Sequence, residues 1–561
     1  MYYIIMILLF FKPSLKKEYL NEQILRGITG LIFSWFLFYV VCVDRSIYFI
    51  MAALWVPAIF QMGLSLGSKD KNKGKFAGAM CVLFFLSIGY SLYPFITAGA
   101  SKLATSVSVV ESSEGVLKAD ANHIIVISPE TAYYEMQKML GTLPNPSIYS
   151  IGKLGITMTK EGAAYVAPIE VDGFFRALTN SEIPGAIYVS AEKPEEAKVI
   201  SVPSKIAESL LLGKDLERYL RQQKPSSILF QANVELDDEG NPYYVGSYGH
   251  YKFGRKFPVI DGVLLYSFKD AKVLDYKVDK VPAWVDEVHP SDIAELYNEY
   301  FGTLQNGLLN KFIAKKGIHI PTTWQAETNV QGLKVNSVEV TGVIDTDGKM
   351  KWFTDHTNTS NDSTTMTGYS MMDMRSGKMI YYKTPGYING KGAMNAVDKA
   401  LGADKANWAP VQPLFYNIFG SEAWVVPVVN KNDGAIVKIG IVAAKNSYVV
   451  LEESKDAAIE SFKNAISYGK INDASNKNAN SVKAEEKLIS GKVLRINPVT
   501  EGGNTIFYVK LIGNNTIFMV SKSAGIDIVL TKENDEVEIK YLDIKDSNVV
   551  STVAFKNSNL K

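Results

Sequence analysis

The sequence predicts N-terminal transmembrane helices, then α+β repeats in which a helix lies on an antiparallel sheet, and a C-terminal small β-barrel. Three observations support this fold class. Long uncharged runs occur in the first hundred residues, a strand-turn-strand segment recurs, and short strands follow a polar linker. Several domains are expected, because a chain of 561 residues exceeds the roughly 250 to 300 residues at which single cores stop growing.

Residues 1–101 form the predicted membrane domain. Three uncharged runs, at about 27–43, 47–67 and 77–98, are each about long enough to cross a hydrocarbon core of about 30 Å as a helix. The segment 2–11 reaches only about half that thickness. It is therefore expected to be either an interfacial segment or a short additional span.

Basic residues on either side of the first two runs predict the orientation, because short basic loops stay in the cytoplasm. They precede the first run at Lys12, Lys16, Lys17 and Arg26 and follow the second at Lys69, Lys71, Lys73 and Lys75. The first helix then runs outward, and the third brings the rest of the chain outside. We expect a multi-pass protein of the cell membrane with its C-terminal domain outside the cytoplasm.

The predicted spans carry little chemistry. Residues 63–67 fit the G-x-S-x-G pattern that presents a nucleophilic serine, here Ser65. That serine would need a base, and no histidine precedes His123, so small residues for close helix contact are the favoured interpretation. The three runs contain no Asp, Glu, Lys, Arg or His, which disfavours an ion or proton pathway.

A strand-turn-strand segment recurs in the soluble part. Residues 262–276 align without a gap with residues 368–382, with glycine, lysine and tyrosine in register. Residues 185–200 look like a third copy with a longer turn. Helical segments precede these groups of strands. The recurring order predicts four α+β units, at residues 102–202, 203–281, 282–385 and 386–470.

The two aligned hairpins share the pattern [KR]-x-[AG]-K-x-x-x-Y, from Lys269 to Tyr276 and from Arg375 to Tyr382. This pattern resembles the terminal hairpin of PepSY-like and cystatin-like domains, in which a helix packs across a curved sheet. The resemblance implies tandem, non-enzymatic extracytoplasmic modules for binding or regulation.

Residues 471–487 are rich in Asn, Ser, Lys and Ala and form the predicted linker. Short strands then alternate with turns over residues 488–561, which resembles an OB-fold or a related β-barrel. OB-folds often hold single-stranded nucleic acid in basic grooves. Residues 484–561 contain ten Lys or Arg and ten Asp or Glu, and the whole chain has a net charge of +1, so no nucleic acid partner is expected.

Residues for catalysis or metal binding do not gather in the sequence. The two cysteines, Cys42 and Cys81, lie in the N-terminal apolar stretches, so the soluble part can form no disulfide and no cysteine zinc site. The histidines are far apart: His123, His250, His289, His319 and His356. A metal site would therefore have to be assembled by the fold. We predict no catalytic, cofactor-binding or metal-ligating residue and no cofactor.

Two acidic motifs have structural interpretations. Asp286, Glu287 and His289 lie between a tryptophan and a proline, and they are interpreted as an inter-unit connection that caps the following helix. Residues 345–348, Asp-Thr-Asp-Gly, lie between two strand-like stretches. They are interpreted as a hairpin turn, because the other ligands of a calcium loop are missing.

These observations favour a membrane-anchored extracytoplasmic protein of the cell envelope that is non-enzymatic and binds or organises other proteins. The expected partners are the lipid bilayer and either other proteins or further copies of the chain. The 30 tyrosines and 7 tryptophans supply side chains that anchor interfaces. Two alternatives stay open: a membrane-bound hydrolase with a site formed between the repeat units, and a subunit of a transport or secretion complex.

Overall fold

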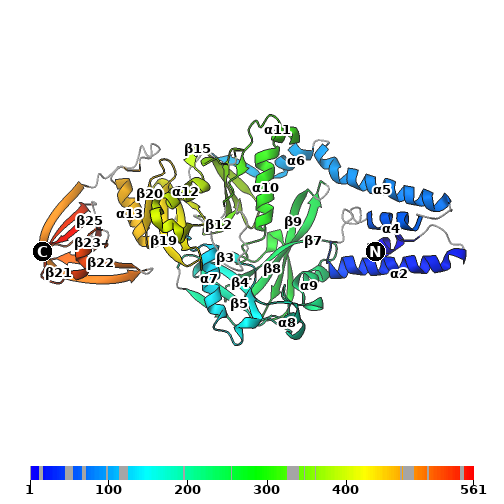
Figure 1. Ribbon diagram of the computed structural model, residues 1–561, viewed down its shortest axis with the longest axis horizontal. Helices are drawn as coiled ribbons and strands as arrows, with labels where there is room; N and C mark the ends of the chain where they lie inside the picture. The colour runs from blue at the N-terminus through cyan, green and yellow to red at the C-terminus, as the bar shows by residue number, and fades with distance from the viewer. Residues whose placement is uncertain are drawn as a thin grey trace.

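The fold is an elongated, sheet-rich α+β arrangement with helices at its N-terminal end (Figure 1). Helices α2 and α5 extend from one end of a body of four sheets, and the last five strands lie at the other end. This computed structural model describes residues 2–11, 17–44, 55–65, 71–96, 99–112, 124–193, 196–253, 256–324, 340–345, 348–360, 362–467, 470–471, 485–501, 504–522, 524–543 and 549–560.

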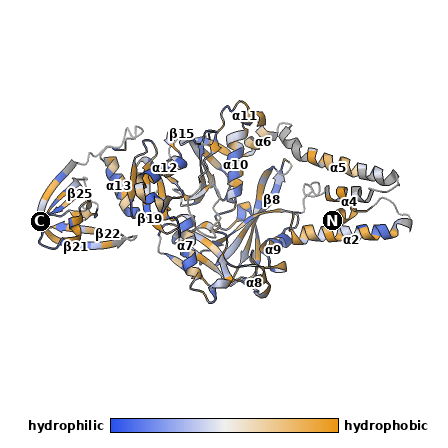
Figure 2. Ribbon diagram, in the orientation of Figure 1, coloured by the Kyte–Doolittle hydropathy of each residue, from blue (hydrophilic) through white to orange (hydrophobic). Residues whose placement is uncertain are grey.

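The N-terminal helices include one candidate membrane span. The elements are α1 (Tyr2–Leu8), η1 (Lys17–Tyr19), α2 (Leu20–Trp35), the π-helical η2 (Phe36–Val40), α4 (Trp55–Ser65), α5 (Lys71–Ile96) and α6 (Gly99–Ser106). Within the described residues, the continuous helix Leu20–Val40 alone is long and apolar enough to cross a membrane, and a signal sequence near an N-terminus would pass the same test. Hydrophobic residues dominate the part of α2 nearest the body (Figure 2).

The structure therefore supports one candidate span where the sequence predicts three. The run predicted at 47–67 is described as a helix only over the eleven residues of α4, about half of a bilayer crossing. The run predicted at 77–98 lies in α5 as far as Ile96, and three lysines occupy the start of that helix. The short segment 2–11 contains α1, and its Met6 packs on Phe38 of η2.

Four separate, predominantly antiparallel sheets form the body. The first contains β2 (Tyr149–Ile151), β3 (Gly155–Thr159), β4 (Gly162–Val171), β5 (Ala186–Ser190) and β6 (Ala197–Ile200), with α7 (Pro129–Leu140), η4 (Pro146–Ile148) and α8 (Phe174–Thr179) nearby in sequence. The second contains β7 (Ile228–Leu236), β8 (Pro242–Lys252), β9 (Phe257–Ser267) and β10 (Val273–Lys277), with η5 (Leu212–Lys214), α9 (Leu216–Gln223) and η6 (Val278–Lys280).

The third and fourth sheets follow the same plan. The third contains β11 (Ile320–Pro321), β12 (Thr341–Ile344), β13 (Met350–Thr357), β14 (Thr365–Asp373) and β15 (Met379–Ile388), with α10 (Ser291–Leu304) and α11 (Leu308–Phe312). The fourth contains β16 (Trp408–Pro410), β17 (Leu414–Ile418), β18 (Ser421–Asn430), β19 (Ile436–Ala443) and β20 (Val449–Glu452), with α12 (Gly390–Leu401), η7 (Gly402–Ala406) and α13 (Lys455–Ser467).

The two hairpins that align in the sequence also pair in one register. Gly262 lies opposite Lys277 in β9–β10, and Gly368 lies opposite Lys383 in β14–β15. The hairpin geometry requires glycine at these positions, because an added Cβ would collide with the neighbouring strand. A Cβ at Gly262 would lie 2.1 Å from the carbonyl oxygen of Tyr276. The aligned glycines are thus places of close backbone approach.

Glycine also makes room for the helix that covers a sheet. In the second sheet, a Cβ at Gly246 would lie 2.7 Å from a methyl group of Leu220 in α9. In the fourth sheet, a Cβ at Gly440 would lie 2.8 Å from a methyl group of Val397 in α12. A helix side chain therefore packs directly onto the strand backbone in both sheets.

One apolar core joins all four sheets, and a second buried cluster, which includes Val166 and Leu264, lies on the first and second sheets alone. Buried side chains from every sheet belong to the shared core, such as Ile187, Val263, Met371 and Val425. Strand β1 (Val109–Ser112) also connects parts of the body that are distant in sequence, because it pairs in parallel with β15 at the edge of the third sheet. The sequence grouped residues 102–202 as one unit, so the place of β1 beside the third sheet is a finding that it did not anticipate.

The body also contacts the end of the candidate span. Arg218 of α9 donates from Nε to the carbonyl oxygen of Tyr39 at 2.8 Å, and its guanidinium lies 4.9 Å from the centre of the Tyr39 ring. This contact fixes α9 beside the C-terminal end of the helix Leu20–Val40.

Each of the C-terminal strands is hydrogen-bonded to two others, so that the first and last strands in the order also pair. The five strands are β21 (Glu485–Glu501), β22 (Asn504–Leu511), β23 (Ile517–Val520), β24 (Glu536–Asp543) and β25 (Val549–Asn557), with η8 (Ile526–Leu530) between β23 and β24. The long β21 pairs with β24 through its first half and with β22 through its second half, while β23 and β25 pair in parallel. These strands enclose a separate core that includes Val493, Phe518 and Ile539.

Candidate functional site

A cavity of about 190 Å³ lies where the four sheet-bearing parts of the body meet, and we call it the junction cavity. Its polar and aromatic lining comes from regions far apart in the sequence: Glu130, Lys153, Tyr165, Asn233, Glu287, Ser291, Trp324, Thr341, Trp352 and Gln412. All four stretches predicted as repeat units contribute to this lining. The relative position of the units therefore determines which side chains meet in the junction cavity.

Glu130 is the least compensated polar group of the junction cavity. It lies in the first turn of α7, behind Pro129 and the N-cap Ser128, whose side chain accepts a hydrogen bond from the Thr131 amide at 3.3 Å. Its side chain is fully buried. Within the described part of the chain, neither of its carboxyl oxygens makes a hydrogen bond of good geometry. Burial raises the pKa of Glu130, and its own backbone and the Ser128 hydroxyl only partly oppose this effect.

Lys153 and Glu287 form the charged side of the cavity. The Lys153 ammonium donates to Asn233 Oδ1 at 2.6 Å, which connects the first sheet to the second. Burial lowers the pKa of Lys153, although attraction to Glu287 and Glu208 opposes this. Burial also raises the pKa of Glu287 to about 7, against the influence of Lys153 and Asn233. Both groups therefore have a partner of opposite charge inside the protein, whereas no positive charge opposes the effect of burial on Glu130.

Aromatic rings supply much of the remaining wall. Trp324 and Trp352 are both more than nine-tenths buried. Trp352 is fixed by a hydrogen bond from its indole nitrogen to the carbonyl oxygen of His289 at 2.7 Å. Tyr165 and Gln412 form a 3.2 Å hydrogen bond that connects the first and fourth sheets. The junction cavity thus combines a carboxyl group whose protonated form is favoured by burial, an ammonium group and aromatic rings.

The acidic motif behind the cavity is a connection between units, and the residue before the following helix is Pro290. Asp286 Oδ2 accepts from the Met158 amide at 2.6 Å and from the Thr157 hydroxyl at 2.9 Å. Helix α10 begins after Pro290, with no side-chain cap. A proline before the helix leaves no side-chain oxygen at that position, so these carboxyl groups serve contacts across sheets.

Glu235 of β7 holds this connection from the second sheet. Its two carboxyl oxygens accept from the amides of Asp286 and Glu287 at 2.7 and 2.9 Å. Burial raises the pKa of Glu235 well above its usual value, and the nearby charge of Asp286 adds to this effect. Glu235 could not be identified from the sequence, because its partners are backbone amides 51 and 52 residues away.

The fold brings two of the five histidines together. The Nδ1 atoms of His319 and His356 lie 2.8 Å apart, and His356 Nε2 lies 2.9 Å from Asn298 Oδ1. His250 pairs instead with Asp261, and His123 lies outside the described residues. Among the side chains that the structure places, no group of three or more His, Cys, Asp or Glu is arranged to hold a metal ion.

The remaining candidate motifs have no part in the junction cavity. Asp345 and Gly348 form the ends of a tight turn between β12 and β13, with a hydrogen bond from the Gly348 amide to the Asp345 carbonyl oxygen at 2.9 Å. This agrees with the turn interpretation, although residues 346 and 347 lie outside the described residues. Ser65 ends α4 in the N-terminal helical region.

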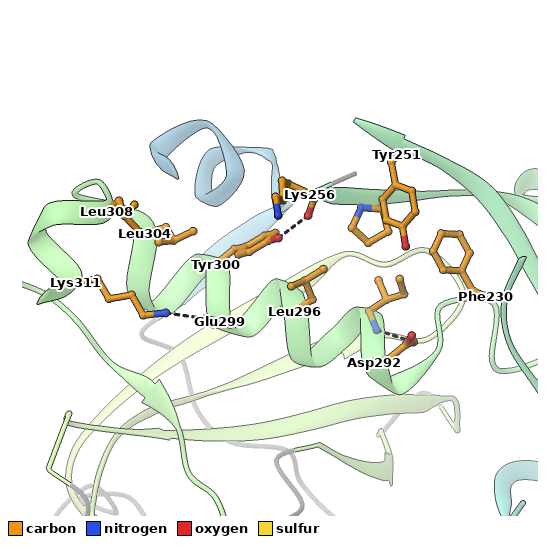
Figure 3. A pocket seen from close by; sticks show the side chains of 12 residues that line it. Phe230, Tyr251, Lys256, Asp292, Leu296, Glu299, Tyr300, Leu304, Leu308 and Lys311 are labelled. Atoms are coloured by element: carbon orange, nitrogen blue, oxygen red, sulfur yellow. Dashed lines mark hydrogen bonds and ion pairs between the residues drawn. The ribbon is translucent and has the colours of Figure 1, made fainter. Parts of the chain in front are cut away.

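Two further cavities are less well suited to ligand binding. One of about 370 Å³ runs along α10 and is shown in Figure 3. Its acidic groups already have partners: Glu299 pairs with Lys311 at 2.7 Å, and Asp292 accepts from the Ile293 amide at 2.9 Å. The other, of about 490 Å³, lies between α9 and the second sheet and is acidic, with Asp215 capping α9.

Comparison with known proteins gives no relative from which a function could be transferred. No family model matches the chain, and no curated protein matches it. A solved exo-beta-1,3-galactanase from Clostridium thermocellum aligns over 72% of this chain and 76% of its own, at 10% identity and a TM-score of 0.18. Such a low TM-score carries no argument about fold or activity.

Proposed function

We propose that this protein is a membrane-anchored, extracytoplasmic and non-enzymatic binding protein of the cell envelope, which holds a small ligand in the junction cavity. The observation that carries the proposal is the position of this cavity, where residues from all four sheet-bearing parts meet around the buried Glu130 carboxyl. Ligand pockets are typically apolar hollows with a few convergent polar groups. A ligand there would touch all four parts and favour one arrangement of them.

The anchoring rests on the apolar helix Leu20–Val40 and on the basic segments around the apolar runs. We extend it to a multi-pass anchor that includes α4 and α5, with the body outside the cytoplasm. The contact between Arg218 and Tyr39 supports a body that lies close to the bilayer, because Tyr39 belongs to the last turn of the candidate span.

The body and the C-terminal strands suit a binding role. The shared hairpin register around Gly262 and Gly368 supports related, PepSY-like units in tandem. The C-terminal strand order β21-β22-β23-β25-β24, with a parallel β23–β25 pair, supports the OB-like proposal. We assign this barrel to contacts with other proteins, because residues 484–561 contain as many acidic as basic residues, which does not favour binding of nucleic acid.

The test is ligand binding by the full chain in lipid nanodiscs. Thermal unfolding would be followed with a panel of cationic, anionic and neutral small solutes, for the wild type and for Ser291→Phe. Ser291 is half-buried at the edge of the cavity, so a bulky ring there should obstruct it. We expect at least one solute class to stabilise the wild type and not the variant. If no solute shifts the wild-type transition, the proposal is wrong.

A second candidate function has one specific observation in its favour. Glu130 and Glu287 are two carboxyl groups on one cavity, contributed by different units, and the pKa of Glu287 lies at about 7. Two carboxyl groups in one site can act as acid and base in hydrolysis. Turnover of a cell-wall glycan or peptide that is lost in Glu287→Gln would support the hydrolase and replace the non-enzymatic proposal.

A further inference from the structure

We propose that the ligand of the junction cavity is a small organic cation, whose ammonium group pairs with Glu130 and whose apolar part lies against Trp324 and Trp352. This inference rests on the proposed binding function and adds the chemical class of the ligand. It follows from an unpartnered carboxyl, an imbalance of charge and the nature of the walls.

The first step concerns the carboxyl group. A buried polar group without a hydrogen bond costs roughly 1 to 3 kcal/mol, so such groups usually have partners. Both oxygens of Glu130 lack one within the described chain, although the side chain is fully buried and lines a cavity. A ligand with donor groups would remove this deficit, and an ammonium group brings donors as well as a compensating charge.

The second step concerns charge. Among the described lining residues, the ionisable side chains of opposite charge are Lys153 on one side and Glu130 and Glu287 on the other. Lys153 is attracted to Glu287, Glu208 and Asp292. If both carboxyl groups are ionised, the cavity lacks one positive charge. A ligand with a single positive charge supplies it, whereas an anion would face two carboxyl groups.

The third step concerns the walls. Indole rings attract cations through their electron-rich faces, and cages of aromatic rings are a common way to bind quaternary ammonium groups. Two indoles and the Tyr165 ring line the junction cavity. Glu130 also lies in the first turn of α7, where the helix dipole favours a negative charge, so its ionisation in the presence of a cation is assisted.

The titratable groups facing the cavity define the expected pH dependence. They are Tyr165 on β4, Lys153 before β3 and Glu287 before α10, in addition to Glu130 itself. Binding of a cation requires ionised Glu130, and burial raises the pKa of this group. The affinity for a permanently charged cation should therefore fall as the pH is lowered through the pKa of Glu130. A neutral ligand would not show this loss.

The experiment compares choline with 3,3-dimethylbutan-1-ol, the neutral compound in which carbon replaces the quaternary nitrogen. Binding to the full chain in nanodiscs would be measured by calorimetry between pH 5 and 8, for the wild type, Glu130→Gln and Glu161→Gln. Glu161 is an exposed residue in the turn between β3 and β4, paired with Lys198, and provides the control. Butylamine against butan-1-ol extends the comparison to primary amines.

We expect the cations to bind the wild type and the control more tightly than their neutral counterparts. Glu130→Gln should weaken cation binding on the order of ten- to hundredfold and reduce the loss at low pH to the part that Glu287 contributes. Since glutamine resembles the protonated carboxyl, this variant should keep its fold. If it does not, the wild-type pH profile and the neutral counterparts still decide the question.

The outcomes separate the two proposals. If neutral or anionic solutes stabilise the wild type and not Ser291→Phe, while both cations fail, the cation proposal is wrong and the binding function stands. If cations bind equally to wild type and Glu130→Gln at every pH, the assigned role of Glu130 is wrong. If no solute binds, both proposals fall.

Discussion

His319 and His356 face one another through their Nδ1 atoms at 2.8 Å, in a buried cluster that also holds Asn298 and Tyr381. One of the two nitrogens must donate and the other accept, so the contact requires at least the accepting ring to be neutral. Burial lowers the pKa of His319 to about 4 and that of His356 well below its usual value. This neutral pair is a pH-sensitive element of the third sheet.

The first prediction is that His319 lowers the free energy of unfolding in mild acid. Its folded-state pKa lies below the value near 6.5 of an unfolded histidine, so the unfolded state binds more protons as the pH falls. Relative to His319→Phe, the wild type should lose on the order of 2 kcal/mol between pH 6.5 and 4. Denaturant unfolding of the two proteins at several pH values measures this difference. A constant difference across that range would contradict the prediction.

Asp355 should have the opposite effect on the pH dependence of stability. Its Oδ2 accepts from the Gly390 amide at 2.9 Å and thereby joins β13 to the start of α12. Burial raises the pKa of Asp355 to about 6, so the folded state binds the proton more tightly than the unfolded state. The stability that this provides is present below about pH 4 and is lost as the pH rises to about 6.

The measurement for Asp355 uses Asp355→Asn, which can still accept the Gly390 hydrogen bond but does not titrate. Relative to this variant, the wild type should become less stable by on the order of 2 kcal/mol as the pH rises from 4 to 6. Parallel pH profiles of wild type and variant would show that Asp355 does not titrate in this way.

The hairpin glycines give a prediction that does not depend on pH. Gly262→Ala should destabilise the protein by about 2 to 4 kcal/mol, because its Cβ would meet the carbonyl oxygen of Tyr276 at 2.1 Å. Gly368→Ala should behave alike. Gly213→Ala is the matched control, since its added Cβ would meet no atom within 4 Å beyond its immediate neighbours in the chain. Thermal unfolding distinguishes them, and equal effects of Gly262→Ala and Gly213→Ala would contradict the assigned close approach.

The hairpins could be anticipated from the sequence because their signal is local. Alternating apolar residues, a tight turn and an aligned glycine fall within fifteen residues, and the pairing of Gly262 with Lys277 follows from the turn. The place of β1 could not be anticipated, because its partner Met379 lies far along the chain and a four-residue strand carries no sign of the sheet that it joins.

The junction cavity could not be predicted from the sequence either. Glu130 follows Ser128 and Pro129, and this order indicates only the start of a helix. Its burial depends on sheets formed by residues more distant in the chain, and Gln412 comes from the last of them. Sequence reasoning named the possibility of a site between units, but no residue of the cavity lining except Glu287 was singled out.

Arg375 carries the last prediction, because it holds the connection between the second and third sheets. Its guanidinium donates to the carbonyl oxygens of Val281 at 2.9 Å and Pro282 at 2.8 Å, and also contacts those of Ala283 and Val285. Several carbonyl groups of one connecting segment thus share a single cation. Lysine cannot replace this arrangement, since it lacks the planar fork of donors.

Arg375→Met should therefore destabilise the body on the order of 3 kcal/mol, and Arg375→Lys should recover only part of the loss. Arg176→Met is the control, because Arg176 forms an exposed ion pair with Asp172 that contributes little. Hydrogen exchange of the amides from residue 281 to 288 reports on the connection directly, and it should accelerate in Arg375→Met alone. Because this segment ends beside Glu287, the same variant should also weaken ligand binding in the junction cavity, which Arg176→Met should leave unchanged.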